Sequence, residues 1–149
     1  MSLSGLNWLS VVISVIATFA SGAIWFGPKT FYPVWMKALG REIPKERVKM
    51  TGGETLLMFG GTFVAAFIQV LTLAVVIGML KTLGPVGAGV GAVFGFGLSV
   101  GLGAFASLSH RMFSQPDFKV YRSLKVWLIE VGQDVLCLTL AGAILGAWA

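Results

Sequence analysis

The sequence predicts an all-α membrane protein in which four transmembrane helices form an antiparallel bundle within one domain, residues 1–149. Apolar residues make up 56% of the chain and charged residues only 11%, and the mean hydropathy is +0.88. A soluble domain carries about 25% charged residues, so this composition could not cover a water-exposed surface. Four stretches also reach the roughly 20 apolar residues that a spanning helix needs.

Turn-forming residues separate the expected spans. Gly-Pro pairs end the first span at 27–28 and form a tight turn between the second and third at 84–85, and Gln-Pro-Asp at 115–117 follows the third. Because the turn at 84–85 is short, we expect the second and third helices to be antiparallel neighbours. The expected spans are residues 6–26, 55–80, 86–108 and 126–148.

Basic residues predict the orientation of the chain. Ten of the eleven Lys and Arg residues lie in the loops 27–54 and 109–125, and Lys81 lies on the opposite side. The positive-inside rule places both loops in the cytoplasm and both termini outside. We therefore expect the basic loops to face lipid headgroups rather than nucleic acid. No Lys or Arg precedes Lys29, so the first span lacks the basic region of a secretory signal.

The first cytoplasmic loop is rich in aromatic residues. Trp35, Met36 and Leu39 can share one helical face, which is typical of a helix lying on the inner leaflet. The alternative is an aromatic belt that closes the first span. The expected interfacial anchors are Trp25, Phe31, Tyr32, Trp35 and Trp127.

The fourth span carries two acidic residues. Glu130 and Asp134 are four residues apart and share a face with Gln133 and Cys137. Asp134 lies about 12 Å into the expected span by helix rise, where a charge costs about 2.5–3.5 kcal/mol. Such residues often mark an ion or proton path.

Polar residues of the other spans lie at a similar depth, so a midplane cluster of Asp134 with Thr18, Gln69 and Ser99 is possible. The carboxyls could be protonated, bind a cation, pair with His110 or Arg111, or meet a basic residue of another protein. The structural alternative is that a protonated Asp134 hydrogen-bonds Gln69 and ties two helices together, while Glu130 reaches the interface.

Small residues recur every fourth position in the third span. They let helix backbones approach closely, either inside one bundle or between subunits of a homo-oligomer or larger complex. The first row consists of Gly87, Gly91, Gly95, Ser99 and Gly103. A second row runs beside it and consists of Gly89, Val93, Gly97 and Gly101.

The sequence predicts no metal site, no cofactor and no catalytic residue. His110 is the single histidine and so cannot build a metal site alone; it is an interfacial residue or a proton acceptor near neutral pH. Cys137 is the single cysteine, which excludes an internal disulfide. We find no zinc-ligand spacing, phosphate-binding loop or dinucleotide motif.

Several motifs resemble the DUF1761 family of bacterial membrane proteins, a family of unknown function. They are Asn-Trp at 7–8, Trp-Phe-Gly-Pro at 25–28, Phe31, Trp-Met-Lys at 35–37, Gly40 and the glycine-rich ending 142–148. The resemblance implies a four-helix architecture in a bacterial inner (cytoplasmic) membrane and no particular activity. Near residues 132–133 the family implies an aromatic residue or His, whereas Gln133-Asp134 stands here.

Three functions are compatible with this pattern. The first is an oligomeric transporter or channel for protons, cations or a small solute that uses the polar midplane. The second is a non-catalytic accessory or scaffold subunit of a larger membrane complex. The third, a lipid-modifying enzyme, would need a nucleophile or metal site, for which His110, Arg111 and Asp117 are poor substitutes.

Overall fold

The computed structural model describes residues 5–44, 46, 49–114 and 119–149, none of which lies in a strand. Four helical stretches are long and apolar enough to cross a membrane, as predicted: Trp8–Trp25, Gly52–Lys81, Ala88–Phe113 and Val120–Ala147. The break predicted at 115–117, with Asp117, and the loop residues Lys45 and Arg47 lie outside the described residues.

Helix α1 (Trp8–Trp25) is followed by a short helix, α2 (Tyr32–Leu39), in the first predicted loop. The Asn7 side chain caps α1 by accepting a hydrogen bond from the backbone N–H of Ser10, at 3.2 Å. At the end of α2, Gly40 takes a left-handed conformation with φ 72°. This conformation favours glycine, which has no Cβ, and the guanidinium of Arg122 lies against Gly40.

The second span is built from α3 (Gly52–Thr55), a π-helical turn η2 (Leu56–Gly60) and α4 (Gly61–Lys81). Its start is a capping box, in which Glu54 accepts from the backbone N–H of Thr51 at 2.8 Å and the Thr51 hydroxyl accepts from the N–H of Glu54 at 3.3 Å. The π-helical turn adds local irregularity of the kind often found at functional sites.

The third span consists of α5 (Ala88–Leu98), a second π-helical turn η3 (Ser99–Ala104) and α6 (Phe105–Phe113), and the fourth is α7 (Val120–Ala147). The third helix therefore runs past the predicted end at residue 108, and α7 begins before the predicted start at 126. Hydropathy measures the width of the hydrocarbon core, whereas a helix continues into its polar flanks as long as its hydrogen bonds do.

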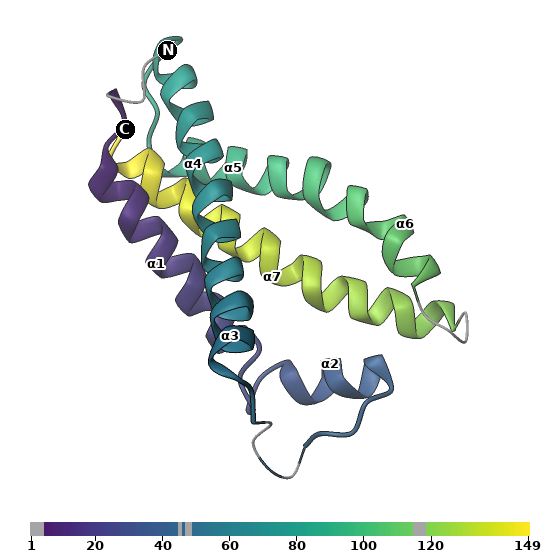
Figure 1. Cartoon of the computed structure of the whole chain (residues 1–149). Helices are drawn as coiled ribbons and strands as arrows, with labels where there is room; N and C mark the ends of the chain where they lie inside the picture. Colours follow the sequence, from purple (N-terminus) through teal and green to yellow (C-terminus); the bar gives the residue numbers. More distant parts are fainter. Residues whose placement is uncertain (1–4, 45, 47–48, 115–118) are drawn as a thin grey trace.

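Helix α7 lies at the centre of the molecule and contacts α1, α2, α4, α5 and α6 (Figure 1). Helices α4 and α5 diverge from the turn that joins them and contact each other only over a short stretch. The main core lies toward the end of the molecule where both termini are found. It consists of Val11, Val15, Val70, Leu73, Ala74, Ile77, Ala141 and Leu145.

Glycines set the close approach of α5 and α7. A Cβ at Gly91 would collide with the carbonyl oxygen of Gly142, and one at Gly95 would collide with that of Leu138. Of the predicted small-residue row, Gly91, Gly95 and Ser99 are buried, and the carbonyl of Gly87 faces Gly146, whereas a Cβ at Gly103 would meet open space. The row therefore serves packing within the chain along its first part.

Candidate functional site

A pocket of about 440 Å³ lies between α1, the first part of the second span and α7. Its polar lining is Thr18, Thr62, Gln69, Gln133, Asp134 and Cys137. Its apolar lining includes Phe19 from α1, Phe26 directly after α1, and Met58 and Phe59 from η2. The structure thus brings three of the predicted midplane residues, Thr18, Gln69 and Asp134, to one cavity together with Gln133.

Asp134 is the charged residue of this pocket. It lies about 21 Å from the start of α7 by helix rise, halfway along the 28-residue helix. Its side chain forms no hydrogen bond and no salt bridge with the described part of the chain, and it is exposed. An acidic group in this position is available to a ligand.

Hydrogen bonds hold the pocket wall beside Asp134. The Gln133 amide Nε2 donates to the Sγ of Cys137 at 3.2 Å, and that thiol donates to the carbonyl of Thr18 at 3.4 Å. This chain joins α7 to α1. Gly22 makes room for it, since a Cβ there would lie 3.1 Å from Gln133 Nε2.

Glu130 lies outside this pocket lining. Arg111 Nε lies 2.6 Å from its Oε2, and the indole Nε1 of Trp35 donates to its Oε1 at 3.0 Å. Of the partners predicted for the two carboxyls, Arg111 is therefore the one that forms a salt bridge with Glu130. The contacts join α6, α2 and α7 at one end of the molecule.

Ser99 lines a different pocket, of about 360 Å³, between α4, the third span and α7. Its side chain is 2% exposed, and its hydroxyl has no hydrogen-bond partner among the described residues. Gln69 lines both pockets. Ser99 and Asp134 therefore line different pockets beside α7. The depth of a residue along a helix can be read from a sequence, but the direction of its side chain depends on packing.

The predicted interfacial anchors also make contacts between helices that the sequence did not reveal. Trp25 Nε1 donates to the carbonyl of Ile129 at 3.0 Å, and its ring stacks on Phe31 with centroids 4.2 Å apart. Trp127 Nε1 donates to the carbonyl of Ala104, in η3, at 3.0 Å. The available signal was the indole N–H itself, which usually finds a partner when it is buried.

The ring of Trp35 packs edge-on against Phe26 with centroids 5.3 Å apart and lies 6.3 Å from the ring of Tyr32. His110, the possible proton acceptor, is exposed in the last turn of α6. The described residues contain no group of three or more His, Cys, Asp or Glu side chains that could hold a metal ion.

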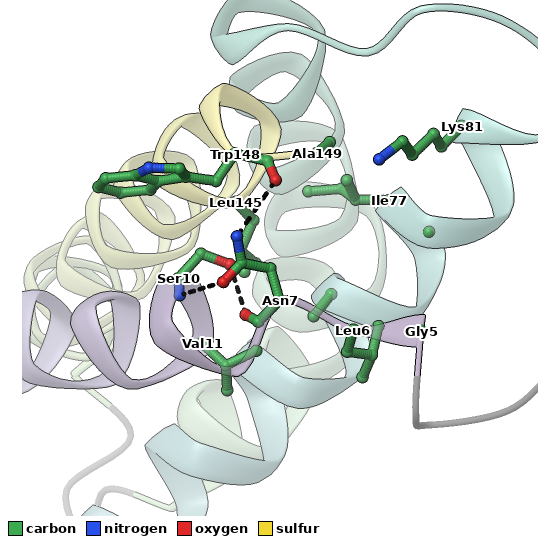
Figure 2. Close-up of a pocket in the computed structure, with 12 residues that line it drawn as sticks. Gly5, Leu6, Asn7, Ser10, Val11, Ile77, Lys81, Leu145, Trp148 and Ala149 are labelled. Atoms are coloured by element: carbon green, nitrogen blue, oxygen red, sulfur yellow. Dashed lines mark hydrogen bonds between the residues drawn. The ribbon is translucent and has the colours of Figure 1, made fainter.

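A third pocket, of about 60 Å³, lies at the end of the molecule that holds both termini (Figure 2). Asn7 donates from Nδ2 to the carbonyl of Trp148 at 3.5 Å, so the beginning of α1 meets the end of α7. The lining also includes Lys81. This pocket is too small for more than a few water molecules.

The architecture defines an all-helical protein with four candidate membrane spans. In the middle of the central span, Asp134 carries a carboxylate with no ion-pair partner among the residues that the structure describes. The chain belongs to the family described as protein of unknown function, DUF1761, whose profile matches residues 9–146. The match covers nearly the whole chain and confirms the resemblance seen in the sequence. No curated protein and no solved structure matches the chain.

Proposed function

We propose that this chain is an integral membrane protein that binds a proton, a cation or a small solute beside Asp134 and moves it across the bilayer. The observation that carries the proposal is the carboxylate of Asp134, which lines a pocket of about 440 Å³ and has no salt bridge among the described residues.

The energetic argument concerns the middle of the span. A carboxylate at the centre of a bilayer costs about 2.5–3.5 kcal/mol on insertion scales. A structural role would offset this cost through an internal partner, as Glu130 does with Arg111. Asp134 lacks such a partner in the described residues, so a proton or a bound cation would neutralise it. Reversible neutralisation of this kind is what a carrier needs.

The proposed orientation follows the basic residues. Four spans place both ends of the chain on one side of the bilayer, and the two termini lie at the same end of the molecule in Figure 1. The described cations Lys29, Lys37, Arg41 and Lys49 precede the second span and Arg111 ends the third, whereas Lys81 ends the second. The positive-inside rule then puts the Glu130 end in the cytoplasm.

Proton flux tests the proposal. Purified protein is placed in vesicles that hold a pH-sensitive dye, and a potassium gradient with valinomycin drives protons inward. We expect flux for the unmodified protein and for Asp134→Glu, which keeps the carboxyl, and loss of flux for Asp134→Asn. Equal flux in Asp134→Asn and the unmodified protein would overturn the role of Asp134, and flux no faster than in protein-free vesicles would overturn proton transport.

A second candidate function is that of an accessory subunit. The second small-residue row of the third span supports it, because Gly89, Gly97 and Gly101 are exposed and a Cβ on each would meet no atom within 4 Å. Such a face allows a helix of another protein, or of a second copy, to approach closely. The test is the composition of the particle extracted from native membranes in mild detergent. Other proteins in that particle favour the accessory function, and this chain alone favours the transporter.

A further inference from the structure

The walls of the Asp134 pocket combine aromatic rings with one negative charge. Phe19 of α1, Phe26 directly after α1 and Phe59 of η2 line it together with Met58. The faces of aromatic rings carry negative electrostatic potential and attract cations, and methionine adapts its shape to apolar ligands. A carboxylate set among rings suits a ligand that is both positively charged and apolar.

The same lining is poorly suited to a metal ion. Hard cations such as Ca²⁺ take six to eight oxygen ligands, whereas this pocket offers one carboxylate, from Asp134, beside two amides, from Gln69 and Gln133, and two hydroxyls. The Thr62 hydroxyl donates to the carbonyl of Met58 at 2.6 Å. The Thr18 hydroxyl already donates to the carbonyl of Val15 at 2.9 Å. The volume of about 440 Å³ would also hold on the order of ten water molecules, far more space than a bare ion fills.

The volume instead matches an organic molecule, because ligand pockets of roughly 300–1,000 Å³ hold compounds of drug size. We propose that the ligand of this pocket is an organic monocation with an apolar body, whose charge pairs with Asp134 and whose body lies against Phe19, Phe26 and Phe59. This inference rests on the proposed function for the location of the site, and it adds the chemical class of the substrate.

The amides extend this argument to the polar end of the ligand. The Nε2 of Gln133 is engaged by Cys137, which leaves the amide oxygen of Gln133 free to accept from an N–H group. Gln69 has no hydrogen bond with the described residues and is exposed beside the pocket. Primary and secondary ammonium groups would use these acceptors, whereas a quaternary cation would use the carboxylate and the rings alone.

Tetraphenylphosphonium is a suitable probe, since its charge is permanent and its body is aromatic. Binding of the labelled probe to the purified full chain in lipid nanodiscs is measured by equilibrium dialysis. We expect saturable binding that weakens at least tenfold in Asp134→Asn and several-fold in Phe59→Leu, and that Asp134→Glu retains. Phe96→Leu is the matched control, because Phe96 is exposed on α5 and lines none of the pockets described above.

Competition separates the ligand classes. Neutral triphenylphosphine oxide and rubidium ions should displace the probe weakly, and aliphatic or aromatic amines should displace it well.

Absence of saturable binding, or equal binding by Asp134→Asn, overturns the inference. If the unmodified protein conducts protons in an Asp134-dependent way yet fails to bind the probe, the substrate class is wrong while the proposed function stands. If it binds the probe but conducts no protons, the organic-cation site stands and proton transport does not. Size-exclusion chromatography of each variant verifies that it is folded.

Discussion

The indole N–H of Trp35 and the carboxylate of Glu130 form a hydrogen bond of 3.0 Å between α2 and the first half of α7. Arg111 lies 2.6 Å from the other carboxylate oxygen. The glutamate side chain is 18% exposed, so water screens these contacts only in part. The short helix α2 is therefore attached to α7 by a hydrogen bond to a charged group.

Replacing Trp35 tests this attachment. Trp35→Phe keeps an aromatic ring beside Phe26 but removes the donor, and hydrogen bonds to charged groups contribute about 1.5–3 kcal/mol. We expect the free energy of unfolding, measured by SDS titration in mixed micelles, to fall by about 1–3 kcal/mol. Tyr32→Phe is the control, since no hydrogen bond joins the Tyr32 hydroxyl to another described residue. Equal stability of the two variants would contradict the assigned role of the indole.

The glycine contact between α5 and α7 gives a second prediction. Gly91→Ala places a methyl group against the carbonyl of Gly142, and overpacking of this kind costs about 1–3 kcal/mol, sometimes more. Gly97→Ala, on the same helix with open space around it, should change stability by less than about 1 kcal/mol. Thermal unfolding in detergent compares the two. A Gly97→Ala protein as unstable as Gly91→Ala would mean that this face is covered in the folded particle.

The third prediction concerns the contact between Trp25 and α7. Trp25→Phe preserves stacking on Phe31 but loses the hydrogen bond to the carbonyl of Ile129, which contributes about 0.5–1.5 kcal/mol. Trp148→Phe changes an indole that makes no side-chain hydrogen bond within the described structure and is 48% exposed. Unfolding titrations should show a loss only for Trp25→Phe, and identical curves would exclude a stabilising role for this bond.

The fourth prediction concerns orientation. Cys137 is buried, so it should react slowly with a membrane-impermeant maleimide, and Cys137→Ser removes it altogether. In that background, Leu83→Cys lies in the turn after α4 at a position 85% exposed and should be labelled in intact cells. Lys37→Cys, exposed on α2, should be labelled only after the cells are broken. The opposite pattern would invert the proposed topology.

Much of the fold could be predicted from the sequence because long apolar segments bounded by turn residues strongly favour helices. Length, apolar composition and the Gly-Pro pairs predicted four helices, and the glycines at 91 and 95 predicted a close helix contact. The π-helical turns η2 and η3 were not predicted. In a π-helical turn each hydrogen bond spans one residue more than in an α-helix. The apolar residues 56–60 and 99–104 carry no sequence pattern that distinguishes a π-helical turn from an α-helix.

The candidate site was predicted in its residues but only partly in its arrangement. Thr18, Gln69 and Asp134 were grouped by depth, and they share a pocket. Ser99 was grouped with them for the same reason but lines another pocket. Gln133 and Glu130 were placed beside Asp134 by helix face; Gln133 lines the same pocket, whereas Glu130 pairs with Arg111. Equal depth leaves rotation about the helix axis undetermined, and that rotation is set here by the glycine contact of α5 with α7 and by the indole contacts of Trp25 and Trp35.

The central position of α7 has a consequence for biosynthesis. Helix α7 follows all the other described helices in the chain. Helix α5 packs chiefly against α7 and against the continuation of its own span. In the proposed membrane topology, α5 enters the bilayer while its partner α7 is still being translated, so its glycines then face lipid. Native packing of the third span must therefore wait until α7 has left the ribosome, so this chain completes its tertiary structure late rather than span by span.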